Sequence, residues 1–375
     1  MQENRRVLIL YASGGMGHVK EAEALEGAFA ARHPEITVRN INVLDFANRP
    51  FRHIYEDGYN FISAYAIGIW RWMYHRYDVK KRHGLLMNLS SAAMDDSLRK
   101  FLDQYRPDYI IGTHPMPVRM LTHHPWPASH PVPLAIVVTD YGCHSYWVDK
   151  KIHRFFVAAD EVRSSIVGMG ILADHITVSG IPIDSKYSRF VDRAAKQAEL
   201  GLDPNIPTIL VIGGLVSETY LRELVVGLRQ HLPVQFLIVT GRDWQLQRRL
   251  RRSTVRRDAG VKIFGFVDNL QELFGVADLV VTKAGGMTVS ESLAKGVPLV
   301  IPSAIPGQED DNLAFLIRYG VAVYAKGIDE MVGVLARMLR QPQTIAHMKE
   351  RCQKLGRPNA ATDIVETIAH DLEKL

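Results

Sequence analysis

Short apolar segments alternate with helical patterns along almost the whole chain. The expected strands are RVLILY, ITVRNINVL, YIIGTH, LAIVVTD, RFFVAA, ITVSG, TILVIGG, VQFLIVTG, VKIFGF, LVVTKAG, PLVIPS and VAVYA. Many of them are apolar at every position, as strands covered on both faces are, and strands that alternate with helices favour parallel sheets. The pattern therefore predicts an α/β fold made of doubly wound sheets.

The best domain boundary lies near residues 184–207, where a helical segment stops at a glycine and a turn leads into the strand TILVIGG. Each half begins in the same way, with an apolar strand, a Gly-rich turn and a helix. A chain of 375 residues is long enough for two domains. We predict two Rossmann-like domains facing across a cleft, at residues 1–190 and 191–355, and a C-terminal helix at 356–375 that packs back on the N-terminal domain.

The composition is that of a soluble globular protein, with 47% hydrophobic and 23% charged residues. The two cysteines, Cys143 and Cys352, exclude a disulfide framework and suit a reducing compartment. No apolar run approaches the roughly 20 residues that span a bilayer, and the first residues do not resemble a secretory signal. We therefore expect a cytoplasmic protein.

The net charge of +5 permits an anionic partner without selecting one. Basic residues gather at 71–83 and 242–257, and each group could equally be a solvated helix face. In the segment 51–86, aromatic residues stand beside arginines and lysines, which suits an anionic membrane surface. We expect peripheral attachment to the cytoplasmic face of the membrane. We expect no nucleic-acid partner, because no recognised nucleic-acid motif is present.

The first Gly-rich turn, YASGGMGHVKEAEALEGAF, joins an apolar strand to a helix expected from Val19. Its glycines allow a tight turn and close backbone approach. His18 therefore lies at a strand-to-helix turn, where the helix dipole favours an anion. It is either an incidental residue of that connection or a functional imidazole, which is available as a base at neutral pH.

The second Gly-rich turn follows the strand Leu279–Thr282, in TKAGGMTVSESLAKG. Gly285 and Gly286 let a diphosphate approach the backbone at the start of a helix expected to open with Thr288. Glu291 could then accept ribose hydroxyls, or could be a solvent-facing carboxylate. The next loop, PSAIPGQEDDN, carries amide and acid groups that suit sugar hydroxyls.

A third segment, VVTDYGCHSYWVDKK, places Asp140 at the end of a strand and His144 and Trp147 in the loop that follows. Trp147 is either a core aromatic or a contact to an acceptor. The histidines of THPMPVRMLTHHPWPASHP, beginning with His114, match no metal template and are interpreted as loop residues. The sequence contains no P-loop and no zinc spacing. It also lacks a GxGxxG fingerprint after the first strand, which disfavours an NAD oxidoreductase.

Taken in order, the glycine turn with His18, the VVTD segment, VSGIPI, GFVDN, TKAGGMTVSESLAKGVPLVI and PGQEDDN resemble one family across residues 5–355. It is the family of monogalactosyldiacylglycerol synthases and processive diacylglycerol glucosyltransferases. That family is similar to the transferase that adds N-acetylglucosamine to lipid I. This chain departs from it in GGLVSETY, in Met16 and in the acidity of GQEDDN, which leaves the donor and acceptor identity open.

The resemblance implies a GT-B fold and an inverting, metal-free transferase that uses a UDP-sugar as co-substrate and a membrane lipid as acceptor. His18 would be the catalytic base, with Asp140 as the alternative. Implied donor-binding residues are Gly213, Gly214, Ser217, Phe266, Val267, Gly285, Gly286, Met287, Thr288, Glu291, Gln308 and Glu309. Implied acceptor-side residues are Gly15, Gly17, His144 and Trp147. No metal and no other cofactor is expected.

Three other functions remain open at this point. They are a transferase of the lipid I type, a UDP-sugar epimerase of the same architecture, and a non-enzymatic nucleic-acid-binding module that uses residues 242–257. The sugar, the lipid, the number of sugars added and the oligomeric state are not determined by these patterns.

Overall fold

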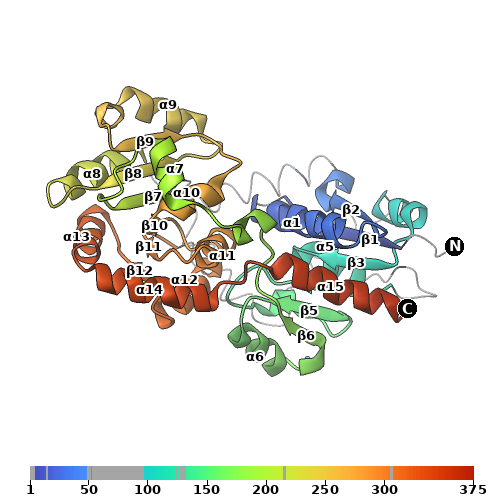
Figure 1. Ribbon diagram of the computed structural model, residues 1–375. Helices are drawn as coiled ribbons and strands as arrows, with labels where there is room; N and C mark the ends of the chain where they lie inside the picture. The colour runs from blue at the N-terminus through green and yellow to red at the C-terminus, as the bar shows by residue number, and fades with distance from the viewer. Residues whose placement is uncertain are drawn as a thin grey trace. The chain divides into compact units, whose positions relative to one another are not determined.

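Two six-stranded parallel sheets form the framework of the protein (Figure 1). The computed structural model describes residues 5–13, 16–48, 52, 97–123, 126, 132–213, 217–304 and 307–375. Each segment predicted to be a strand contains one, so the predicted strands and the α/β class are confirmed. The chain divides into two compact units, Met1–Ser185 with Pro306–Asp311 and Arg357–Leu375, and Lys186–Ile305 with Asn312–Gly356.

The first sheet has the strand order β2-β1-β3-β4-β5-β6, with every pair parallel. Its strands are β1 (Arg6–Tyr11), β2 (Thr37–Asn42), β3 (Tyr109–Gly112), β4 (Leu134–Val137), β5 (Arg154–Val157) and β6 (Ile176–Val178). Its helical elements are α1 (Met16–Arg32), η1 (Val43–Phe46), α5 (Pro115–His123), η2 (Ser145–Trp147), α6 (Asp160–Gly168), η3 (Ala173–His175) and, from the end of the chain, α15 (Ala360–Glu373). The short helix η4 (Ser185–Ser188) begins at the last residue of this part of the first unit and continues into the second.

The second sheet has the order β12-β11-β10-β7-β8-β9. Its strands are β7 (Thr208–Ile212), β8 (Gln235–Val239), β9 (Val261–Phe264), β10 (Leu279–Val281), β11 (Leu299–Ile301) and β12 (Ala322–Tyr324). Its helical elements are α7 (Arg193–Leu200), α8 (Glu218–Arg229), α9 (Trp244–Arg252), η5 (Thr254–Arg257), α10 (Leu270–Val276), α11 (Gly286–Ala294), α12 (Gln308–Arg318), α13 (Ile328–Leu339) and α14 (Pro342–Leu355).

Alternate residues of the continuously apolar strands enter different cores. In β1, Leu8 and Leu10 belong to one cluster, whereas Val7 and Ile9 belong to the cluster that contains apolar residues of α1 and α15. The two-residue period of a strand requires this division, and it explains why the segments carry no polar face. Both faces of the first sheet are therefore covered.

The C-terminal helix is joined to the first sheet by a buried carboxylate as well as by apolar contacts. Asp371 accepts two hydrogen bonds from the guanidinium of Arg154 on β5, at 2.7 and 2.8 Å. The hydroxyl of Tyr109 on β3 donates a third, at 3.3 Å. α15 lies against α1 on this face (Figure 1).

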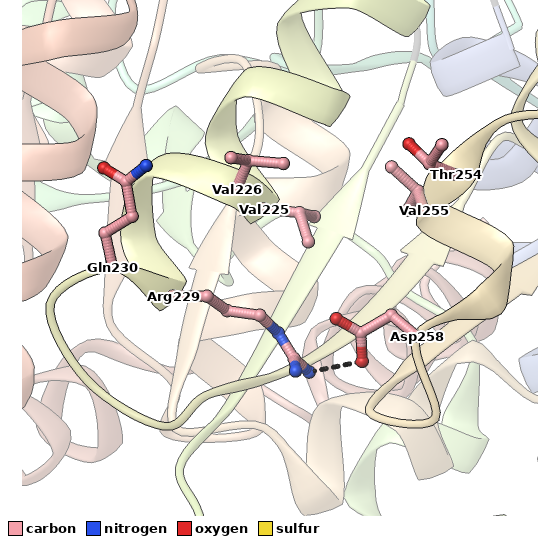
Figure 2. A pocket seen from close by; sticks show the side chains of 7 residues that line it. All are labelled: Val225, Val226, Arg229, Gln230, Thr254, Val255 and Asp258. Carbon is pink, nitrogen blue, oxygen red and sulfur yellow. Dashed lines mark ion pairs between the residues drawn. The ribbon is translucent and has the colours of Figure 1, made fainter.

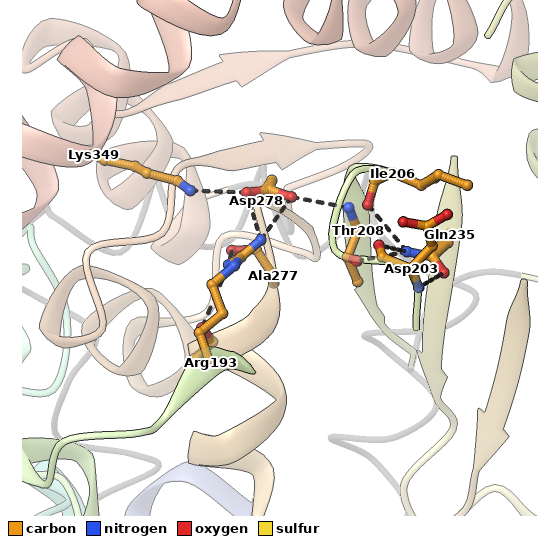
Figure 3. A network of polar contacts seen from close by, with 9 residues as sticks. Arg193, Asp203, Ile206, Thr208, Gln235, Ala277, Asp278 and Lys349 are labelled. Atoms are coloured by element: carbon orange, nitrogen blue, oxygen red, sulfur yellow. Dashed lines mark hydrogen bonds and ion pairs between the residues drawn. The ribbon is translucent and has the colours of Figure 1, made fainter. Parts of the chain in front are cut away.

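An equivalent carboxylate organises the second unit (Figure 3). Asp278, directly before β10, accepts from the backbone N–H of Thr208 at 3.0 Å, from Arg193 at 2.9 and 3.0 Å, and from Lys349 at 3.0 Å. The neighbouring amide of Gln235 closes the loop before β7 by donating to the carbonyls of Asp203 and Ile206. Strand β7 therefore begins at a defined position between two polar anchors.

Candidate active site

The order of strands in the first sheet reverses between β1 and β3, because the chain continues from β1 to β2 on one side and returns to β3 on the other. Ligands of doubly wound sheets bind outside the carboxyl ends of the strands at such a point. The segment after β1 carries His18, and the segment after β3 carries Thr113 and His114. Topology therefore brings the two histidines to one edge of the sheet.

The predicted start of the first helix is wrong by three residues. α1 begins at Met16, so Gly17 and His18 lie in its first turn and not in the turn before it. The energetic penalty of glycine applies to the interior of a helix. In the first turn, where the backbone N–H groups have no acceptor within the helix, a glycine such as Gly17 costs little. Gly14 and Gly15 lie outside the described residues.

The His18 ring is enclosed by aromatic and acidic side chains. Its centroid is 4.8 Å from that of His114, with the rings nearly perpendicular, and 6.4 Å from that of Trp147. Its Nδ1 lies 3.4 Å from Oε2 of Glu21, one turn further along α1. The hydroxyl of Thr113 donates to the His18 carbonyl at 3.0 Å, which joins the start of α1 to the end of β3.

Burial and charge act in opposite directions on this imidazole. Burial lowers the pKa of His18, but the carboxylates of Glu21 and Asp140 outweigh it, so the pKa is raised. Burial raises the pKa of Glu21 to about 7, despite the opposing effect of His18. The pair therefore takes up a proton near neutral pH, which is the range that general base catalysis requires.

His114 lies in the loop between β3 and α5, as the sequence suggested, and it is half-buried there. It directly precedes α5, and its Nδ1 accepts a hydrogen bond from the N–H of Met116 at 3.1 Å. Burial lowers its pKa well below the usual value, and the nearby His18 acts in the same direction. His114 therefore caps the start of α5, whose first residue is Pro115. This capping role was missed from the sequence because the proline-rich segment was interpreted as a loop.

The segment after β4 supplies the remaining predicted residues. Asp140 is buried and lies close enough to influence the pKa of both His18 and Glu21. His144 accepts from the N–H of Tyr146 at 3.1 Å and caps η2. Trp147 belongs to the apolar core, and it also contacts the His18 ring.

The second sheet reverses its order between β7 and β10. After β7, the N–H of Gly213 donates to the carbonyl of Val239 at 2.7 Å, so this amide already has an acceptor in the sheet. The hydroxyl of Ser217 accepts from the N–H of Tyr220 at 3.1 Å and caps α8. Gly214 lies outside the described residues.

After β10, helix α11 begins at Gly286, two residues before the predicted start. Gly285 is its N-cap in extended conformation, and no side chain caps this end. The N–H groups of Gly286, Met287 and Thr288 have no acceptor within the helix. The diphosphate contacts predicted after β10 thus lie at the N-cap and in the first turn of α11, where the dipole favours an anion. Glu291 follows half-buried in the second turn.

Helix α12 is fixed to the same turn by a residue that the sequence analysis did not single out. The buried amide of Asn312 donates to the carbonyl of Ala284 at 2.9 Å. Glu309, one turn earlier, is buried, whereas Asp310 accepts the N–H of Gly307 at 2.9 Å. Gln308 is the first residue of α12, and its side chain lies outside the described part.

An exposed aromatic ring follows β9. Phe266 is 51% exposed, and the guanidinium carbon of Arg242 lies 5.5 Å from its centroid. Val267, beside it, is half-buried. A half-exposed ring beside a cation is a suitable edge for a planar base.

A pocket of about 360 Å³ lies elsewhere in the second unit, between α8 and η5 (Figure 2). Its charged residues are Arg229 and Asp258, whose side chains pair at 2.8 Å. The pocket is at the C-terminal end of α8, and therefore near the amino ends of the strands. None of the predicted site residues lines it, so it is not the candidate active site.

Among the described residues, no group of three or more His, Cys, Asp or Glu side chains could hold a metal ion. The same part of the chain contains no helix with both the length and the apolar character needed to cross a membrane. The aromatic and basic segment 51–86, predicted to meet a membrane, lies outside the described residues except for Arg52.

Two family models match the chain. Residues 18–183 match the model described as monogalactosyldiacylglycerol (MGDG) synthase, and residues 208–364 match the glycosyltransferase family 28 C-terminal domain. A processive diacylglycerol beta-glucosyltransferase of Bacillus cereus (strain AH187) is 28% identical over 371 residues, which cover 98% of this chain and 94% of the relative. The sequence likeness therefore extends through both units.

Solved structures share the fold over nearly the whole chain. MurG of Acinetobacter baumannii is 16% identical with a TM-score of 0.59, over 98% of this chain and 99% of that one. The UDP-GlcNAc 2-epimerase of Neisseria meningitidis, bound to UDP-GlcNAc, is 12% identical with a TM-score of 0.63, over 97% and 100%. The two sheets are the Rossmann-like domains of the predicted GT-B fold.

Proposed function

The chain belongs to the family of monogalactosyldiacylglycerol synthases and processive diacylglycerol glucosyltransferases, and we propose that it transfers a hexose from a UDP-sugar to diacylglycerol or a related membrane lipid. The observation that carries this proposal is the likeness through both units to a processive diacylglycerol glucosyltransferase. The half-buried imidazole and the open helix end at the two switch points supply groups that suit this reaction.

The proposed reaction is a single displacement that inverts the anomeric carbon. The acceptor hydroxyl oxygen forms the new bond to that carbon, and the bond to the diphosphate oxygen breaks with its electron pair going to UDP. The hydroxyl proton goes to His18, whose neutral form is available near neutral pH. Asp140, buried in the same cluster, is the alternative base.

The donor is proposed to bind mostly the second unit. The first turn of α11 would hold the diphosphate through the amides of Gly286, Met287 and Thr288, with Glu291 on the ribose. Phe266 and Val267 would border the uracil, and Gln308 and Glu309 would bind sugar hydroxyls. The helix end would stabilise the leaving charge without a metal ion.

The acceptor is proposed to be a membrane lipid met by the first unit, near Gly15, Gly17, His144 and Trp147. We propose peripheral attachment at the cytoplasmic face through the segment 51–86, on the strength of its aromatic and basic composition. Binding should then weaken as salt rises and prefer vesicles that contain anionic lipid.

The test is to incubate the protein with diacylglycerol vesicles and several UDP-sugars and to identify the lipid product by mass spectrometry. A glycosylated diacylglycerol supports the proposal. A product formed only with lipid I would favour the related N-acetylglucosaminyltransferase, and release of a free epimerised sugar without acceptor would favour an epimerase. In the active reaction, His18→Ala should lower kcat by about 100-fold or more. Asp140→Asn should have that effect instead if Asp140 is the base.

A further inference from the structure

Glu21 is the most unusual charged residue of the first unit. It occupies the second turn of α1, yet its side chain is only 2% exposed. Acidic residues are almost never fully buried without a partner. On the same helix, Glu23 is 51% exposed and pairs with Lys20, as an ordinary surface carboxylate does. Glu21 lies on the face of α1 that carries the buried residues Leu25 and Ala28, whereas Glu23 lies on the solvent side.

The partner of Glu21 is the imidazole of His18. The Oε2 atom lies 3.4 Å from Nδ1, and both of these atoms are buried with no hydrogen-bond partner among the described residues. A small rotation would convert this contact into a hydrogen bond from Nδ1–H to the carboxylate. A buried carboxylate oxygen that faces a buried ring nitrogen stabilises the imidazole tautomer in which that nitrogen carries the proton. For His18 this is the tautomer with the proton on Nδ1.

The other groups around the pair are consistent with this arrangement. Asp140, from the segment after β4, adds a second negative charge. His114, from the segment after β3, stands edge-on to the His18 ring and is held neutral by burial. The only cation of this cluster in the described residues is therefore the imidazolium that His18 becomes when it takes a proton.

We propose that Glu21 is a positioning residue for His18, holding Nδ1–H so that Nε2 is the nitrogen that accepts the proton of the acceptor hydroxyl. This inference rests on the proposed transfer reaction. As the new glycosidic bond forms and the UDP bond breaks, the proton moves to Nε2, and the carboxylate stabilises the imidazolium without itself taking the proton. Water then removes the proton after the product leaves.

The test compares Glu21→Gln with Glu23→Gln, a matched change on an exposed residue of the same helix. Glu21→Gln should lower kcat by about 30- to 1,000-fold and change the KM for the UDP-sugar by less than about threefold. The acid limb of kcat/KM should move to lower pH by roughly one unit, because the charge that raises the pKa of His18 is gone. Glu23→Gln should leave both quantities unchanged.

A direct measurement separates positioning from folding. ¹⁵N NMR of labelled histidine, with the His18 signals identified by their loss in His18→Gln, should show the Nδ1–H tautomer in the parent protein and a lower His18 pKa in Glu21→Gln. If Glu21→Gln loses activity but leaves the tautomer, the His18 pKa and the acid limb unchanged, Glu21 supports only the fold and the inference is overturned. Retention of kcat within threefold overturns it as well.

The failure of the proposed function has a different signature. In that case the parent protein forms no glycolipid with any acceptor, while the NMR titration still reports whether Glu21 controls the protonation of His18. An unchanged His18 pKa then overturns the pairing, and a lowered one retains it.

Discussion

Replacing Asp371 by Asn should release the C-terminal helix from the first sheet. The side chain is 7% exposed and accepts two short hydrogen bonds from Arg154 and one from Tyr109. The amide of Asn keeps the size but replaces one acceptor by a donor that faces the guanidinium, and it removes the negative charge. A charge-assisted bond contributes about 1.5–3 kcal/mol, and breaking a buried ion pair costs about 3–5 kcal/mol.

Because Arg154 is 19% exposed, water can solvate part of the freed guanidinium. We therefore expect a loss of about 2–4 kcal/mol in the free energy of opening α15. Amide hydrogen exchange followed by mass spectrometry measures this locally, which avoids treating a two-unit chain as a single two-state transition. Exchange in peptides from residues 360–373 should accelerate by roughly 30- to 700-fold, at tenfold per 1.4 kcal/mol.

The control is Glu373→Gln, whose side chain is 78% exposed and only 3.5 Å from His370. It should change the exchange of α15 by less than about threefold, as an exposed ion pair does. If Asp371→Asn also stays within threefold of the parent protein, apolar packing of α15 alone holds the helix, and our reasoning about the buried carboxylate is refuted.

Four further predictions concern the two switch points and their supports. Gly180 has φ +88°, and an added Cβ would lie 2.5 Å from Cβ of Arg357. Urea unfolding should therefore show that Gly180→Ala destabilises the first unit by about 2 kcal/mol or more. The control Gly168→Ala, where the added Cβ meets no neighbour, should not destabilise it. Asn312→Ala removes the side-chain amide that donates to the Ala284 carbonyl. In steady-state assays it should raise the KM for the UDP-sugar more than it lowers kcat. The control Asn205→Ala, in an exposed loop, should change neither quantity. The kcat/KM of the parent protein should fall as the pH drops through about 7, because the Glu21–His18 pair, whose pKa values are raised, then takes up a proton and the base is disabled. A flat profile between pH 5 and 8 would exclude this pair as the base. EDTA should leave the initial rate unchanged, and a loss that Mg²⁺ restores would contradict metal-free departure of UDP.

The expected strands and the class of fold follow from local patterns in the amino-acid sequence. Each of the expected strands is a continuous apolar segment, and this signal is local, because a strand covered on both faces must be apolar at every position. The Gly-rich segments that follow β1 and β10 were recognised for the same local reason. Helix starts were misplaced by two or three residues, since no capping side chain marks Gly285, and Gly14 and Gly15 precede Met16.

The tertiary structure alone decided which residues meet. The strand order brings His114 to His18, and it brings Asp140 close enough to influence the pKa of Glu21. Likewise, only the folded chain pairs Asn312 with Ala284 and Asp371 with Arg154. Periodicity states which face of an element is buried, but it carries no information about which distant side chain lies opposite. The order of strands in each sheet supplies that information, and a buried polar residue acquires its role from the partner it meets there.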